Sequence, residues 1–171
     1  MDEYLIVDGY NIIHAWPELE QLSGDSSLEH ARTRLVDILV NYAALTGEHV
    51  VVVFDAHQVK QAGDRSETVG GVEVVYTPEG ETADAVIEKL VGELSRRGTV
   101  YVATYDWAEQ RMILGRGAYR ITPRELWEKV QRTREEGKKH FDSGRPADAY
   151  LENRLVDEIR LIFERWRRRK D

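Results

Sequence analysis

Four short runs of apolar residues place the strongest constraint on how this chain can fold. They span residues 4–7, 50–54, 72–76 and 99–104, with helical patterns or polar loops between them. A strand that is apolar on both faces is typical of a parallel sheet covered by helices on both sides. The sequence therefore predicts an α/β fold, a three-layer sandwich with a mainly parallel central sheet, to which residues 118–121 add a short fifth strand.

Two helices are predicted between these runs from the signals at their ends. Ser26 and Glu29 form a capping-box pattern at the start of the first helix, and Gly47 is placed to end it. Thr82 is placed to cap the second helix, which is expected to end near Gly98. Residues 57–71 are predicted to form one long polar loop.

The pattern changes after residue 121. Thr122, Pro123 and Glu125 are typical of the start of a helix, and a further amphipathic helix is predicted over residues 151–166. We therefore expect a sheet domain at residues 1–121 and a helical extension at residues 122–171 that packs on it.

The absence of cysteine limits the chemistry of the chain. It excludes disulfide partners, thiolate zinc sites and cysteine nucleophiles. The five histidines lack zinc-hydrolase spacing, and no P-loop or nucleophile-elbow motif is present. The chain begins without a basic and apolar leader, and its longest apolar run, residues 50–54, is too short to span a membrane. We expect a cytoplasmic protein without a membrane partner.

The net charge of −7 is unevenly distributed. Residues 1–119 hold 9 Lys and Arg against 20 Asp and Glu, whereas residues 120–171 hold 15 against 11. An acidic body with a basic end is not typical of a protein that coats nucleic acid over its whole surface. It indicates a concentration of carboxylates in the body and a terminal element that meets an anionic partner; a solvated amphipathic helix with surplus arginines is the alternative.

Acidic residues gather where the predicted strands end. Asp8, Asp55 and Asp106 follow three strands, and Glu81 and Asp84 lie where the third strand leads into its helix. Ligands of open parallel sheets bind beyond these strand ends. Carboxylates that meet there repel one another unless a cation lies among them, and Mg²⁺ or Mn²⁺ prefers such oxygen ligands. The pattern favours a metal-dependent phosphoryl-transfer site, with helix capping as the alternative for single residues.

Five segments also carry a resemblance to a known family. They span residues 7–13, 53–57, 81–84, 104–110 and 163–168, and the first contains Asp8, Gly9, Tyr10 and Asn11 in succession. Together they resemble NYN-domain proteins, relatives of the PIN-domain nucleases. The likeness covers nearly the whole chain and narrows to the YacP-type bacterial subgroup, the ribosome-associated messenger-RNA endonucleases.

The resemblance implies a PIN-like fold and a set of site residues. Asp8, Asp84 and Asp106 are implied as the acidic site for Mg²⁺ or Mn²⁺, with Asn11 beside them and Glu81 as a further acidic member.

Two features around this implied site differ from, or add to, the family pattern. Thr104 is predicted to share a strand face with Asp106 because strand side chains alternate. Tyr105 stands where the family has a small residue, usually serine, and residues 134–147 are only loosely similar.

The leading hypothesis is a metal-dependent endoribonuclease that cleaves messenger RNA at the ribosome. In a two-metal mechanism one ion activates water and the other stabilises the leaving oxygen, and Asp55 is expected to complete the ligand shell or orient water. Asn11 and Thr104 are predicted to contact the RNA; a bond to nearby turn backbone is the alternative for Asn11. Tyr10 and Trp16 are predicted to stack on bases, with core packing as the alternative.

Two other functions fit the same residues. One is a non-catalytic scaffold that binds RNA or the ribosome, although acidic residues that face phosphate do not help a binder. The other is a toxin-type PIN ribonuclease held by an antitoxin, which the Asp-Gly-Tyr-Asn opening argues against.

The basic end of the chain is the predicted contact with ribosomal RNA or substrate. Its positive charges would bind the phosphates of RNA, which the acidic body of the protein repels. The alternative is that these residues only complement the dipole of a helix C-terminus. The arginines concerned are Arg165, Arg167, Arg168 and Arg169.

Overall fold

A single six-stranded sheet forms the centre of the computed structural model, which describes residues 2–25, 27–56, 66–105 and 117–140. The order of its strands is β3-β4-β2-β1-β5-β6, and only β3 runs antiparallel to its neighbour. The strands are β1 (Asp2–Asp8), β2 (His49–Phe54), β3 (Ser66–Val69), β4 (Val72–Tyr76), β5 (Gly98–Ala103) and β6 (Tyr119–Ile121). The predicted sheet is confirmed.

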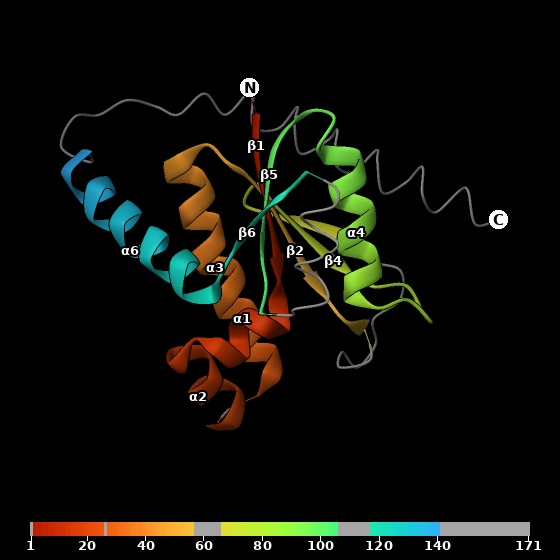
Figure 1. Ribbon diagram of the computed structural model, residues 1–171. Helices are drawn as coiled ribbons and strands as arrows, with labels where there is room; N and C mark the ends of the chain where they lie inside the picture. The colour runs from red at the N-terminus through yellow and green to blue at the C-terminus, as the bar shows by residue number, and fades with distance from the viewer. Residues whose placement is uncertain (1, 26, 57–65, 106–116, 141–171) are drawn as a thin grey trace.

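Helices cover both faces of this sheet (Figure 1). On one face lie α1 (Gly9–Ala15), α2 (Pro17–Asp25), α3 (Leu28–Thr46) and α6 (Pro123–His140). On the other face lies α4 (Ala83–Leu94). This arrangement confirms the three-layer sandwich. None of the helices in the described ranges is long and apolar enough to cross a membrane.

The apolar strands supply a hydrophobic core to each face. Leu5 and Val7 of β1 belong to the core under α1, α3 and α6, whereas Tyr4 and Ile6 belong to the core under α4. This alternation is the reason that the strands read as continuous apolar runs, because both sets of side chains are buried.

The chain between β2 and β4 differs from the prediction of one long loop. Residues 66–69 of it form β3, which pairs with β4 as a hairpin. Gly70 and Gly71 make the two-residue turn with φ of 53° and 88°, and such a glycine pair between two strands is a strong hairpin signal. The prediction was wrong here because the polar side chains of this edge strand hid its pattern.

The structure also corrects one helix boundary and adds two helices. The N-cap of α3 is Ser27, whose Oγ accepts a hydrogen bond from the backbone N–H of His30 at 3.1 Å, so the predicted cap at Ser26 is one residue too early. The predicted cap at Thr82 and the end at Gly47, with φ of 74°, are confirmed. The short helices α1 and α2 were not predicted.

The described part of the predicted C-terminal extension is α6. Leu126 and Val130 of α6 are buried in the core that α3 and the sheet share. The indole N–H of Trp16 donates to the carbonyl of Pro123 at 2.8 Å, and its ring meets that of Trp127 edge to face. α6 therefore packs closely on the body. The division of the chain after residue 121 stays a prediction, and the predicted helix at residues 151–166 lies outside the described residues.

Candidate active site

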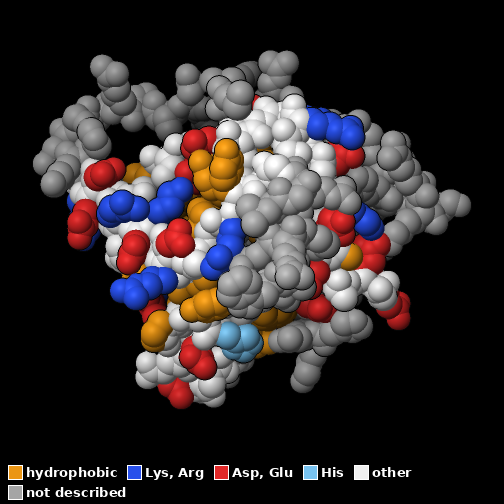
Figure 2. Space-filling model, in the orientation of Figure 1, with side chains coloured by type: hydrophobic (Ala, Val, Ile, Leu, Met, Phe, Trp, Pro, Cys, Tyr) orange, Lys and Arg blue, Asp and Glu red, His pale blue; other side chains and the backbone are white. Residues whose placement is uncertain are grey.

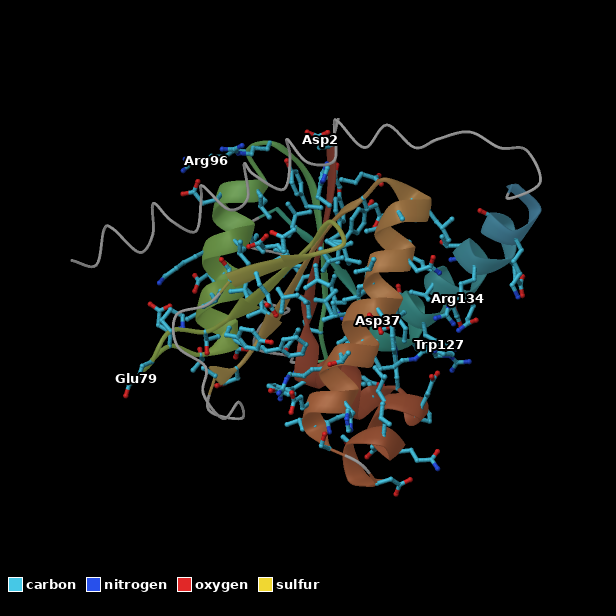
Figure 3. All side chains as sticks on the ribbon, turned by 180° about the vertical axis from the view of Figure 1, so that it is seen from behind. Asp2, Asp37, Glu79, Arg96, Trp127 and Arg134 are labelled. Atoms are coloured by element: carbon cyan, nitrogen blue, oxygen red, sulfur yellow. The ribbon has the colours of Figure 1, made fainter. Side chains whose placement is uncertain are left out.

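The parallel strands end together at one edge of the sheet. In Figure 3, Asp2 at the start of β1 and Arg96 after α4 lie near the top, and Glu79 in the loop after β4 lies lower down, at the left side. The carboxyl edge, on the side of Glu79, is where open α/β sheets bind ligands.

Asp8 ends the central strand β1 and is only 5% exposed. It precedes α1, yet its carboxylate does not cap the helix. Instead Oδ2 accepts a hydrogen bond from Nδ2 of Asn11 at 2.9 Å. A buried carboxylate is stable only with such donors or a cation beside it, because burial removes its water. Asp8 is thus a preoriented acidic group at the centre of the edge.

Asn11 connects two strand ends that are far apart in the sequence. Its Nδ2 donates to Asp8, and its Oδ1 accepts from the backbone N–H of Tyr105 at 3.1 Å. A carboxylate on one side and an N–H on the other fix which way the amide points. The predicted alternative, a bond to nearby turn backbone, is not what these two contacts show. Contact of Asn11 with RNA stays a prediction.

Gly9, between these residues, is required by packing. A Cβ at this position would collide with the ring of Phe54 at the end of β2. The aromatic ring therefore lies directly against the start of α1, and only glycine allows that approach.

Thr104 lies beside Asp8 in space. Val7 of β1 is paired with Ala103 of β5, so the next residues on the two strands, Asp8 and Thr104, stand at the same level. Val7 and Ala103 belong to the core under α1, α3 and α6, so alternation places Asp8 and Thr104 on the opposite face, towards α4. Thr104 is fully buried, and its backbone N–H donates to the carbonyl of Ile121 at 3.3 Å.

Asp84 lies in the first turn of α4, which begins at this same edge, and is half-buried. The helix is capped by Thr82, whose Oγ1 accepts from the N–H of Ala85 at 3.2 Å. Asp84 is therefore not the capping residue. Glu81 accepts a hydrogen bond from Nζ of Lys89 at 2.9 Å. This ion pair already compensates the charge of Glu81, whose role in the site stays a prediction.

The structure does not test the third predicted ligand. Asp106 lies outside the described residues, as do Arg165, Arg167, Arg168 and Arg169. Among residues 2–25, 27–56, 66–105 and 117–140, no three His, Asp or Glu side chains are close enough together to hold a metal ion. Asp8 and Asp84 offer the carboxylate oxygens that Mg²⁺ and Mn²⁺ prefer, so the donor chemistry fits, and a metal site stays a prediction.

Comparison with known proteins identifies the family. The model of the YacP-like NYN domain matches residues 5–168. The chain belongs to this family.

Individual proteins of this family match the chain in sequence and in structure. YacP of Bacillus subtilis (strain 168) is 42% identical over 170 residues, covering 97% of each chain. The crystal structure of Rae1 (YacP) from Bacillus subtilis matches with a TM-score of 0.72 and 40% identity over 98% of this chain and 95% of that one. A mutant of that protein matches with a TM-score of 0.68 and 37% identity over 94% and 91%. The resemblance is confirmed, and the YacP-like NYN domain indicates an RNA-related function of the nuclease type.

Two aromatic residues of this YacP-like NYN domain lie in the core. Tyr10 is 6% exposed and packs its ring against Phe54, and Trp16 is 2% exposed. Neither offers a free ring face, so base stacking by Tyr10 and Trp16 is corrected to core packing, the alternative that the sequence allowed. The neighbouring aromatic residue at the edge, Tyr105, is 56% exposed.

One functional candidate of the YacP-like NYN domain was missed by the sequence reasoning. Arg32 of α3 donates a hydrogen bond from Nη1 to the hydroxyl of Tyr10 at 3.2 Å. Burial raises the pKa of Tyr76 at the end of β4, and the positive charge of Arg32 partly opposes this rise. The one available signal was a basic residue near the start of a helix in an otherwise acidic body.

Proposed function

We propose that this protein is a divalent-metal-dependent endoribonuclease that cleaves messenger RNA in the cytoplasm, in association with the ribosome. The observation that carries the proposal is the buried carboxylate of Asp8, held at 2.9 Å by Asn11 at the carboxyl edge of the sheet. Because Asn11 also binds the backbone N–H of Tyr105, it holds the carboxyl ends of β1 and β5 in one geometry. Such preorganisation is what a catalytic carboxylate needs.

The proposal assigns a role to each residue of the edge. Asp8, Asp84 and Asp106 would hold Mg²⁺ or Mn²⁺ through carboxylate oxygens. A bound metal of this kind activates water and stabilises the charge that develops on the leaving oxygen. Asn11 keeps Asp8 in place, and buried Thr104 supports the same strand end.

The link to the ribosome rests on charge and on family membership. The body of the protein is acidic and repels RNA, so an attachment point of opposite sign is needed. The four C-terminal arginines, Arg165, Arg167, Arg168 and Arg169, supply it.

Two conservative substitutions test the catalytic proposal. Asp8→Asn and Asp84→Asn each remove a charge without opening a cavity, and an Asn at position 8 can still accept the hydrogen bond from Asn11. Cleavage of translated and of naked RNA, with Mg²⁺, Mn²⁺ or a chelator, is expected to slow by roughly 10² to 10³, which corresponds to about 2–4 kcal/mol of transition-state stabilisation. Asp37→Asn, on the exposed side of α3 (Figure 3), is the matched control.

The outcomes separate the candidate functions. Full activity of pure Asp8→Asn protein removes the proposed site. A wild-type protein that binds RNA or ribosomes and cleaves neither substrate supports the non-catalytic scaffold instead.

Ribosome co-sedimentation across a salt series tests the attachment point. Changing the four C-terminal arginines to Gln is expected to flatten the salt dependence by roughly one unit of slope per lost phosphate contact. Arg96→Gln, at the opposite edge from the site (Figure 3), is a control for the loss of one exposed positive charge. Superimposable curves for wild type and the fourfold variant would leave the arginines without a role in docking.

A further inference from the structure

Arg32 lies on the second turn of α3, whose start is at the carboxyl edge of the sheet beside α1 (Figure 1). Its side chain is half-buried, and its Nη1 donates to the hydroxyl of Tyr10 at 3.2 Å. Tyr10 follows Asp8 by two residues. The contact therefore ties Arg32 to the same strand end that carries the candidate acidic site.

Arg32 makes no ion pair with the residues that the structure describes. Arg34, two residues further on, pairs with Glu18 at 3.2 Å, and Arg124 of α6 pairs with Glu128 at 3.5 Å. No carboxylate of residues 2–25, 27–56, 66–105 or 117–140 lies within ion-pair distance of Arg32. A half-buried arginine that makes no ion pair with the described residues keeps donors for an anion from outside.

Tyr10 and Tyr76 lie beside Arg32, and the carboxylates of Asp55, Glu67 and Glu29 act on the same two hydroxyls. Burial raises the pKa of Tyr10 and of Tyr76, and this effect outweighs the lowering by the guanidinium. Both hydroxyls stay protonated at physiological pH, and that of Tyr10 binds the guanidinium without cancelling its charge. A guanidinium has five N–H donors, so most of them remain for another acceptor.

Contacts between aromatic rings make this arrangement rigid. The ring of Phe54 lies 5.3 Å from that of Tyr10 and 5.9 Å from that of Tyr76, measured between centroids. The side chain that binds Arg32 is thus fixed by the core, and little ordering remains when an anion binds.

We propose that Arg32, held by Tyr10, binds a phosphate of the RNA strand next to the phosphate that is cleaved. The proposal rests on the proposed nuclease function and assigns a substrate contact to it. The forked donors of arginine match the oxygens of a phosphodiester.

The position of Arg32 explains why a neighbouring phosphate is the ligand. Asn11 of α1 reaches Asp8 and the end of β5, whereas Tyr10, one residue earlier, packs towards β2 and α3. A strand of RNA that crosses the edge from β5 towards β4 meets the acidic site first and Arg32 next. Arg32 then offsets the repulsion between the acidic edge and the RNA backbone.

Binding in an inactive background tests the proposal without requiring cleavage. In Asp8→Asn protein, Arg32→Gln is expected to weaken the binding of a fluorescent single-stranded oligoribonucleotide roughly tenfold or more. The slope of log affinity against log salt should fall by about 0.7, the value for one lost phosphate contact with a single strand. Arg34→Gln removes the same charge from an exposed position of the same helix and should leave both values unchanged.

A second pair of variants covers the case in which Arg32→Gln does not fold. Arg32→Lys keeps the charge and loses the forked donors, so it should bind several-fold more weakly than Arg34→Lys. In active protein, Arg32→Lys should raise KM for cleavage more than it lowers kcat. Equal RNA binding by folded Arg32 and Arg34 variants would overturn the proposal. If cleavage fails in wild type while Arg32→Gln still weakens binding, the nuclease function is wrong and the phosphate contact stands.

Discussion

At the residue scale, the amide of Asn11 shows that one uncharged side chain can hold two strand ends together. It binds Asp8 three residues before it and Tyr105 94 residues after it. Two such bonds, one of them to a carboxylate, hold the end of β5 against the end of β1. The position of the acidic group therefore depends on a residue that carries no charge.

Replacing Asn11 by Ala tests this dependence. We predict a loss of about 1–3 kcal/mol in the free energy of unfolding, because the buried carboxylate of Asp8 loses a donor, together with slower RNA cleavage. Chemical denaturation and cleavage assays measure the two effects. Asn41→Ala, at an exposed position of α3, is the control. Equal stability of the two variants would show that Asp8 does not depend on Asn11.

Tyr42 provides a prediction of pH dependence at the same scale. Its buried hydroxyl donates to Oε2 of Glu48 at 2.8 Å. Burial, followed by this contact, raises the pKa of Tyr42 far above its ordinary value. Since the folded state holds the proton more tightly than the unfolded state, the stabilisation is complete below about pH 10 and is lost as the pH rises above it.

Denaturation at increasing alkaline pH measures this effect. The free energy of unfolding should fall by at most about 1.4 kcal/mol per pH unit for each such tyrosine above pH ~10, and Tyr42→Phe should make the fall less steep. Tyr119→Phe removes an exposed hydroxyl and is the control. An identical fall in wild type and Tyr42→Phe would contradict the assignment.

At the scale of elements, α6 completes the core on the α3 face. Leu126 and Val130 are buried between α3 and the sheet, and Trp16 fixes the start of α6 through Pro123. In Figure 3, α6 with Trp127 and Arg134 lies next to α3. The first helix after the sheet is thus part of the support on which the carboxyl edge rests.

Truncation of one leucine measures the contribution of α6. Leu126→Ala should lower the free energy of unfolding by about 2–5 kcal/mol, the usual range for a buried leucine. Leu45→Ala removes the same atoms from a side chain that is 40% exposed and should have a smaller effect. Similar losses in both variants would mean that α6 adds little to the core.

At the scale of the whole molecule, charge separates the body from its C-terminal end. Basic and acidic side chains lie interspersed over α6 in Figure 2, whereas the first 119 residues are strongly acidic. Carboxylates that converge at one edge repel one another, and a cation bound only by the folded protein relieves this repulsion. Metal binding is therefore expected to stabilise the fold.

Thermal unfolding with and without millimolar Mn²⁺ or Mg²⁺ measures this coupling. At a metal concentration 100 times Kd, the gain is about 2.7 kcal/mol. The double variant Asp8→Asn/Asp106→Asn should lose the gain, and Asp37→Asn should keep it. The same shift in the double variant as in wild type would place the metal elsewhere.

Local patterns of the sequence were enough to predict several parts of the fold. Continuous apolar runs predicted the parallel strands because both faces of the sheet are covered, and Thr82 and Gly47 marked helix ends because their capping depends only on adjacent backbone. The edge hairpin and the Ser27 cap were missed or shifted because a polar edge strand and neighbouring serines carry weak local signals.

What determines the candidate site is partly local and partly tertiary. The sequence by itself placed Asp8 and Asp84 at the ends of elements and identified the family through short motifs. Only the tertiary structure decided that Asn11 joins β1 to β5, that Tyr10 is buried against Phe54, and that Arg32 meets Tyr10. The physical reason is the strand order β3-β4-β2-β1-β5-β6, which makes neighbours of residues far apart in the chain, and no periodicity or cap signal records which strands lie side by side.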